Sequence, residues 1–251
     1  MPKESRWAVV TGSSSGIGKA TALLLADDGW DVVVHCRANR AGSAEVAAAI
    51  VAKGRRSLVL AADLAQSGAA EKLVDDAWTQ TGGFDAWVHL AGADTLTGVN
   101  AKLSYAAKLE LLTKVDLWAT MIGCRDAGRR MKERGRGAVV MVGWDQAETG
   151  MEGDSGELFG AVKAGVAAFG RSLALSLAPQ ITVNTVAPGW IKTAWGDGAS
   201  NVWQERVLNE TPLRRWGTPD DVAKVIGFLV SERAAFLTGQ TLAVNGGATR
   251  R

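Results

Sequence analysis

Residues 9–18 read Val9-Val10-Thr11-Gly12-Ser13-Ser14-Ser15-Gly16-Ile17-Gly18, a glycine-rich turn between an apolar run and a helical pattern. Glycines at these spacings permit a tight turn and let the backbone come close to a ligand. A helix that starts here directs its unpaired N–H groups and the positive end of its dipole toward the turn. A pyrophosphate group is the ligand expected to bind there. The alternative is a turn that only caps a helix. The segment predicts a dinucleotide site formed by Gly12, Ser14, Ser15, Gly16, Ile17 and Gly18.

Apolar runs rich in β-branched residues alternate with helical patterns along the rest of the chain. The predicted strands are Trp7–Val10, Asp31–Val34, Ser57–Leu60, Ala86–Leu90, Ala138–Val142, Ile181–Val186 and Thr241–Val244. The predicted helices are Lys19–Asp28, Ser43–Lys53, Ala69–Gln80, Lys108–Arg134 and Phe159–Leu177. This order predicts an α/β fold of the Rossmann type, a doubly wound, mostly parallel seven-stranded sheet with helices on both faces. Continuous apolar strands indicate burial on both sides, and no linker divides residues 1–251, so we expect one domain.

Composition excludes several classes of function. With 28 basic and 26 acidic residues the net charge is +2, too balanced for a nucleic-acid binder. No apolar run approaches the ~18 residues of a membrane span, and residues 1–10 leave no room for a signal peptide, so we expect a cytoplasmic protein. Two cysteines and two histidines predict neither a disulfide framework nor a metal site. Ten tryptophans beside a single tyrosine are unusual.

The end of the second predicted strand bears on the choice of dinucleotide. An acidic residue there would bind the adenosine 2′-hydroxyl of NAD. The chain instead reads Val34-His35-Cys36-Arg37-Ala38-Asn39-Arg40, without an acid and with two arginines. Because a guanidinium suits a 2′-phosphate, Arg37 favours NADP(H); the alternative is a solvated basic loop.

From Arg6 to Gly247 the chain resembles the short-chain dehydrogenase/reductase family, in particular its 3-oxoacyl-acyl-carrier-protein reductase type. The resemblance is carried by Thr11-Gly12-x3-Gly16-Ile17-Gly18, His89-Leu90-Ala91-Gly92, Asn184-Thr185-Val186-Ala187-Pro188-Gly189-Trp190-Ile191-x-Thr193 and Asn245-Gly246-Gly247. It implies that Asp63 and Leu64 meet the adenine ring and that Ala91 and Gly92 border the cofactor. It further implies that Pro188, Gly189, Ile191 and Thr193 lie against the nicotinamide. His89 is expected near the adenosine ribose or the sheet edge, as a hydrogen-bonded structural residue rather than a base.

The resemblance also implies four catalytic positions, normally Asn, Ser, Tyr and Lys. In this chain they read Asp116, Trp144, Phe159 and Lys163, so only the lysine, which holds the nicotinamide ribose in the family, is retained. Phenylalanine has no proton to give, and the loss of a positioned general acid typically costs about 10²–10⁴-fold in rate. We therefore expect an NADP(H)-binding protein whose standard carbonyl reductase activity is weak or lost.

The alternative is an active oxidoreductase with another proton path to an unknown carbonyl or alcohol. The candidate donors are Tyr105, expected in a loop, Asp116 or water; Asp116 is more readily a partner for Lys163. The segment from Trp144 to Phe159 is two residues longer than is usual in the family, and its hydroxyl groups, Thr149 and Ser155, do not stand at the serine position.

Partners are predicted from charge and helix composition. The loop before Phe159 carries Asp145, Glu148, Glu152, Asp154 and Glu157 and no base. Such a run is usually solvated, and at a cleft mouth it would slow the approach of an acidic acyl carrier protein. We expect a small-molecule substrate or none. The small residues of the helices at 108–134 and 159–177, which build the interfaces of family dimers, predict a homo-oligomer, most simply a tetramer.

Overall fold

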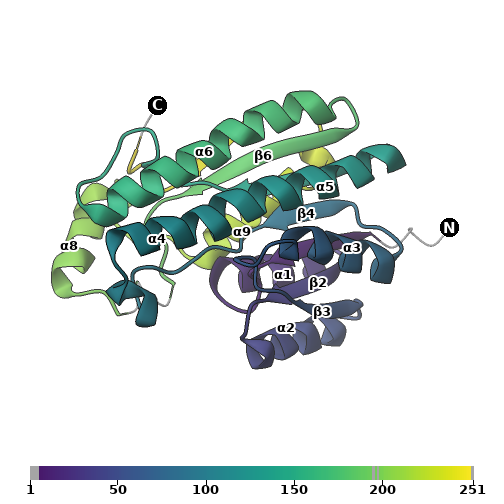
Figure 1. The fold of residues 1–251 in the computed structure, drawn as a ribbon, viewed down its shortest axis with the longest axis horizontal. Helices are drawn as coiled ribbons and strands as arrows, with labels where there is room; N and C mark the ends of the chain where they lie inside the picture. Colours follow the sequence, from purple (N-terminus) through teal and green to yellow (C-terminus); the bar gives the residue numbers. More distant parts are fainter. Residues whose placement is uncertain (1–5, 194–195, 197, 250–251) are drawn as a thin grey trace.

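The computed structural model describes residues 6–193, 196 and 198–249, which form a seven-stranded sheet between helices (Figure 1). The strands are β1 (Trp7–Thr11), β2 (Asp31–Cys36), β3 (Ser57–Ala61), β4 (Ala86–His89), β5 (Gly137–Val142), β6 (Ile181–Pro188) and β7 (Thr241–Val244). Their order is β3-β2-β1-β4-β5-β6-β7, and every neighbouring pair is parallel. The predicted doubly wound α/β fold is confirmed.

Helices cover both faces of this sheet. They are α1 (Gly16–Asp27), α2 (Arg40–Ala52), α3 (Ala69–Thr81), α4 (Tyr105–Leu112), α5 (Ala119–Arg134), α6 (Asp154–Leu177), α8 (Asn201–Glu210) and α9 (Pro219–Leu229). Short 3₁₀ turns are η1 (Val99–Lys102) and η3 (Glu232–Ala234), and η2 (Thr113–Trp118) is a π-helical segment. Residues of α3, α5 and α6 pack into the core on one face, and residues of α1, α2 and α9 pack into the core on the other.

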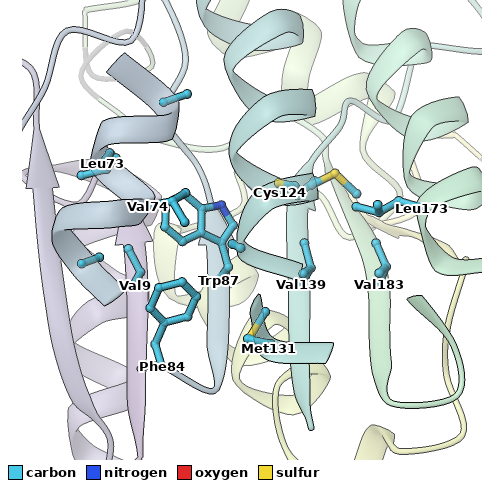
Figure 2. Packing of buried hydrophobic residues seen from close by; sticks show 14 of the residues in the cluster. Val9, Leu73, Val74, Phe84, Trp87, Cys124, Met131, Val139, Leu173 and Val183 are labelled. Atoms are coloured by element: carbon cyan, nitrogen blue, oxygen red, sulfur yellow. The ribbon is translucent and has the colours of Figure 1, made fainter. Parts of the chain in front are cut away.

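The core on the α3–α5–α6 face centres on Trp87 of β4 (Figure 2). Phe84 packs against it with 5.6 Å between ring centroids, and Val139 and Val183 continue the same layer along the sheet. Burial on both sides explains the continuous apolar sequence of the central strands. For β3 and β7 the expectation is wrong, because these strands form the two edges of the sheet and their side chains are partly exposed.

Three helical regions differ from the prediction. The single helix expected over Lys108–Arg134 begins earlier, at Tyr105, and is interrupted by η2. Helix α6 begins at Asp154 rather than Phe159, and its first turn places acidic residues at the positive end of the helix dipole. Helices α8 and α9 were not predicted, although Thr218, Pro219 and Asp221 form a capping box with proline at the first turn, a readable start signal.

Helix α6 is the one helix of the described residues that is long and apolar enough to cross a membrane by length and composition. Its mean hydropathy is 1.3 and 44% of the window is buried inside the protein. Val166 and Leu173 of this helix belong to the core against the sheet. A core helix passes the same test, so this finding is weak evidence for a membrane span.

The sheet order places a crevice at the carboxyl ends of β1 and β4. From β1 the chain builds outward through β2 and β3, then crosses back to add β4 on the other side of β1. Ligands of open α/β sheets bind at such a point, where the strand order reverses.

Candidate functional site

The glycine-rich turn after β1 is held in place by hydroxyl groups. Thr11 Oγ1 accepts hydrogen bonds from the backbone N–H groups of Leu90 (3.0 Å) and Ala91 (2.9 Å), which fastens the end of β1 to the end of β4. Ser13 Oγ donates to the Val10 carbonyl (2.7 Å) and accepts from the N–H of His35 (2.9 Å). These bonds fix the shape of the turn without using its outward N–H groups.

His35 completes this support and was not predicted as a site residue. Its Nδ1 accepts from the Gly12 N–H (3.1 Å), and its Nε2 lies 3.1 Å from the Ala62 carbonyl oxygen. These contacts require the neutral ring with its proton on Nε2. Burial lowers the pKa of His35 from 6.5 to about 4, against the opposing effect of the Ala62 hydrogen bond, so the ring is neutral near pH 7.

Two glycines of the turn are required by close packing. A Cβ on Gly12, which has φ of +67°, would lie 2.9 Å from Ala91 Cα. A Cβ on Gly18 would lie 2.3 Å from the Gly12 carbonyl oxygen. Any side chain at these positions would push the first turn of α1 away from the ends of β1 and β4.

The crevice at the switch point holds a cavity of about 720 Å³, which we call the nucleotide cavity. Most of the predicted cofactor residues line it: Gly12, Ser14, Ser15, Gly16, Ile17, Gly18, Arg37, Asp63, Leu64, Ala91, Gly92 and Thr193. Arg37 is exposed and lines the cavity, whereas Arg40 begins α2 and does not. The glycine cradle, the amino end of α1 and the cation at the end of β2 together fit a phosphorylated dinucleotide.

The other predicted cofactor residues line a second cavity of about 400 Å³, which we call the reaction cavity. They are Lys163, Pro188, Gly189, Ile191 and, shared with the nucleotide cavity, Ile17 and Thr193. Leu96 also borders both spaces. A dinucleotide in the first cavity would therefore reach the second.

Lys163 and Asp116 form a buried ion pair beside the reaction cavity. Lys163 Nζ lies 2.9 Å from Asp116 Oδ1, and their side chains are 8% and 2% exposed. The other carboxylate oxygen accepts from the Ala93 N–H (2.8 Å), and Lys163 also donates to the Val142 carbonyl (3.3 Å). Asp116 lies in the π-helical segment η2, a type of segment that is frequent at functional sites. The pairing expected from the sequence is present.

Aromatic rings stand at the two positions where the resemblance implies serine and tyrosine. Trp144 and Phe159 both line the reaction cavity, with 6.4 Å between ring centroids and an interplanar angle of 62°. Ser155, Phe159 and Lys163 follow at intervals of four residues on α6 and line the same cavity. Ser155 therefore brings a hydroxyl group close to the position that Phe159 leaves without one.

The other candidate donors lie elsewhere. Tyr105 begins α4 behind a Ser104 cap rather than lying in a loop, and it is not among the residues that line the reaction cavity. Its hydroxyl donates to Glu157 Oε2 (3.2 Å), and the pKa of Tyr105 is raised by desolvation and by this hydrogen bond. Thr149 lines a separate cavity together with Glu152 and Arg206.

The acidic segment after Trp144 is not the uniform solvated run that was expected. Asp145 is buried, and its Oδ2 accepts from Asn245 Nδ2 (3.1 Å). Burial raises the pKa of Asp145. Glu152 pairs with Arg206 of α8 (2.8 Å), and Asp154 and Glu157 belong to the first turn of α6. These four acids are therefore divided among three environments, and the early start of α6 accounts for the helical position of Asp154 and Glu157.

His89 also differs from the expectation. It is buried at the end of β4, 6.2 Å from the Trp87 ring between centroids, and does not line the nucleotide cavity. Neither ring nitrogen has a hydrogen-bond partner among the described residues. Burial lowers the pKa of His89 to about 3, with smaller contributions from His35 and Lys163, so the ring is a neutral core group.

Sequence analysis missed Met151, Trp190 and Trp203 as neighbours in the reaction cavity. They come from the loop before α6, the end of β6 and helix α8, which no local pattern connects. The one available signal was the excess of tryptophan.

Comparisons with known proteins found relatives over nearly the whole chain. A family model described as Enoyl-(Acyl carrier protein) reductase matches residues 12–249. The 3-oxoacyl-(acyl-carrier-protein) reductase FabG of Staphylococcus aureus is 34% identical over 252 residues, covering 98% of both chains. The FabG of Aggregatibacter actinomycetemcomitans is 36% identical over 256 residues, covering 97% of this chain and 99% of the relative. A putative short-chain alcohol dehydrogenase from Sinorhizobium meliloti superposes with a TM-score of 0.87 at 33% identity, covering 97% and 96% of the two chains.

Proposed function

Because the chain belongs to the short-chain dehydrogenase/reductase family of oxidoreductases, we propose that it binds NADP(H) but performs the family's usual carbonyl reduction weakly or not at all. When bound, the nicotinamide supplies a hydride to a carbonyl carbon or takes one from an alcohol. The protein must then deliver or remove the proton at the oxygen.

The observation that carries the proposal is the pair of rings beside Lys163. Both rings line the reaction cavity. The family resemblance implies a serine that positions the carbonyl at Trp144 and a tyrosine that protonates it at Phe159. An indole N–H donates a hydrogen bond but does not act as a proton source. Lys163 is held by Asp116 and cannot replace an acid without breaking that buried pair. Loss of the general acid alone corresponds to about 10²–10⁴-fold in rate.

The choice of NADP(H) rests on Arg37 at the nucleotide cavity, where no ion pair to Arg37 is found among the described residues. Titration calorimetry with NADPH and NADH tests it. We expect NADPH to bind more tightly, and Arg37→Ala to weaken NADPH about 10–100-fold while leaving NADH unchanged, since a hydrogen bond to a charged group is worth about 1.5–3 kcal/mol.

Arg40→Ala is the matched control, because it removes the same charge three residues away without touching the cavity. Equal losses of NADPH affinity in the two variants would mean that Arg37 acts only through its long-range positive charge and not through a contact with the 2′-phosphate. Absence of binding of either nucleotide would overturn the proposed function.

A second candidate function, active oxidoreductase with a different proton path, is favoured by one observation. Ser155 lies in the reaction cavity one helical turn before Phe159. Ser155 could relay a proton from water to a bound carbonyl. NADPH consumption with a carbonyl compound that disappears in Ser155→Ala, with unchanged NADPH affinity, would establish this function over the first.

We also propose a cytoplasmic homotetramer that acts on a small molecule or only binds one. Cys36 and Cys124 are free and buried, which suits a reducing compartment. Large apolar side chains are exposed on α6 and η2, Leu175 by 85% and Trp118 by 63%. Such exposure suits an interface between copies of the chain. Light scattering should give four times the chain mass of 26.3 kDa, and a monomer would contradict the proposal.

A further inference from the structure

We propose that the reaction cavity binds a flat, uncharged aromatic carbonyl compound or alcohol of two or three fused rings. This inference rests on the proposed function, since it places the ligand beside the nucleotide cavity. The cavity's volume of about 400 Å³ lies near the lower end of the ~300–1,000 Å³ that is typical of small-molecule sites, which favours a compact ligand over a long chain.

One side of the cavity is built by two tryptophans that are held in position. Trp190 Nε1 donates to Glu210 Oε2 (3.0 Å), and its ring lies 5.4 Å from that of Trp203 at an angle of 55°. The Arg206 guanidinium lies over the Trp203 ring, 4.8 Å from the ring centre. Arg206 itself is fixed by ion pairs to Glu210 and Glu152. The rings are therefore oriented before any ligand arrives, which lowers the entropic cost of binding.

A second aromatic pair, Trp144 and Phe159, contributes to the same lining. All four rings are only partly buried in the protein by itself. Aromatic rings prefer offset or edge-to-face contact with other rings, and such contacts add to the effect of buried area. A planar aromatic ligand would use both pairs, whereas a saturated ring system of the same size would gain only the buried area.

Charge excludes an anionic ligand. Lys163 is the one charged side chain among the described residues that line the cavity, and its ammonium is already paired with Asp116 at 2.9 Å. Nearby, Asp154 and Glu157 lie in the first turn of α6, directly before Phe159. A carboxylate or a phosphate would find no unpaired cation in this lining.

Three probes separate these features: 1-tetralone, its saturated analogue trans-1-decalone, and the anion 2-naphthoate. Their affinities are measured by titration calorimetry of the full chain, with and without saturating NADPH. We expect 1-tetralone to bind about five to ten times more tightly than trans-1-decalone, and 2-naphthoate to bind more weakly than 1-tetralone. Equal affinity for the first two, or tighter binding of the anion, would overturn the proposal.

Variants assign the preference to this cavity. Trp203→Leu should reduce the preference for 1-tetralone over trans-1-decalone by about fivefold, and Trp203→Phe should keep most of it. Phe236→Leu is the control, because Phe236 is fully exposed and outside the cavity lining. An unchanged preference in Trp203→Leu would contradict the assignment. If Trp203→Leu does not fold by circular dichroism, Phe159→Leu replaces it with the same expectation.

The measurements distinguish a failure of the proposed NADP(H) binding from a failure of the proposed aromatic site. Binding of 1-tetralone with the expected preference but without any binding of NADPH would remove the proposed function and leave the aromatic site. Binding of NADPH without a preference among the probes would remove the aromatic site and leave the proposed function.

Discussion

The nucleotide cavity and the reaction cavity share Ile17, Leu96 and Thr193, yet their chemistry is very different. The first has a glycine turn held in place by hydrogen bonds of Thr11, Ser13 and the neutral His35. The second keeps Lys163 but carries rings where hydroxyl groups are implied. If the proposed function holds, the difference teaches that cofactor binding and catalysis place separate demands on one fold. The first depends on backbone shape, and the second depends on a few side-chain atoms.

The largest effect is expected when the implied hydroxyl groups are restored in the reaction cavity, because this would remove the difference between the two cavities. The double variant Phe159→Tyr/Trp144→Ser should raise carbonyl reduction with NADPH about 10²–10⁴-fold, because it returns a general acid one helical turn from Lys163. NADPH oxidation with a panel of small ketones measures this effect. Gly160→Ala, a neighbouring change with only ordinary contact to Trp144 at 3.8 Å, is the control. A native protein that is already faster than the double variant would refute the idea of lost chemistry.

The buried ion pair of Lys163 and Asp116 beside the reaction cavity should contribute to the stability of the fold. Asp116→Ala leaves Lys163 buried without a partner for its ammonium and should lower the free energy of unfolding by about 3–5 kcal/mol, measured by urea denaturation. Glu110→Ala, which removes one partner of the exposed pair with Lys114, should cost at most about 0.5 kcal/mol. Similar losses for the two variants would mean that the buried pair has no special role.

The nucleotide cavity should make stability depend on pH through His35. Its pKa is about 4 in the folded chain and 6.5 in the reference state, so between these values the unfolded chain binds a proton that the folded chain does not. The free energy of unfolding should therefore fall as the pH drops from about 6.5 to 4, by about 3 kcal/mol from this group.

Urea denaturation across that pH range compares the native chain with His35→Asn, in which this contribution should be missing. His89 acts in the same direction and is present in both proteins, so the difference reports His35. Parallel curves for the two proteins would contradict the neutral-ring assignment.

The smallest expected effect tests the backbone of the glycine turn. Gly18→Ala puts a Cβ 2.3 Å from the Gly12 carbonyl oxygen, and overpacking of this kind costs about 1–3 kcal/mol. We expect NADPH affinity to fall about 5–100-fold in calorimetry, while Gly160→Ala again serves as the control. Full affinity in Gly18→Ala would show that the turn adapts and that the contrast between the cavities is weaker than described.

Much of the fold and part of the site could be predicted because the signals are local. The alternation of apolar runs and helical patterns indicated all seven strands, and the glycine spacing indicated the turn at Gly12–Gly18. Interruption of the helix after Tyr105 by η2 was not predicted, because residues 105–118 contain no glycine or proline that would indicate a break. The early start of α6 was missed because acidic residues in a first helical turn look the same as a solvated loop.

The presence of a nucleotide turn, the absence of hydroxyl groups at Trp144 and Phe159 and the basic end of β2 follow from residue identity and spacing within a few positions. The tertiary structure decided which of these residues share a cavity. It separated Arg37 from Arg40, turned Tyr105 toward Glu157, buried Asp145 against Asn245 and brought Trp203 beside Trp190. These contacts depend on how distant segments pack across the sheet and α6, and no sequence period encodes that packing.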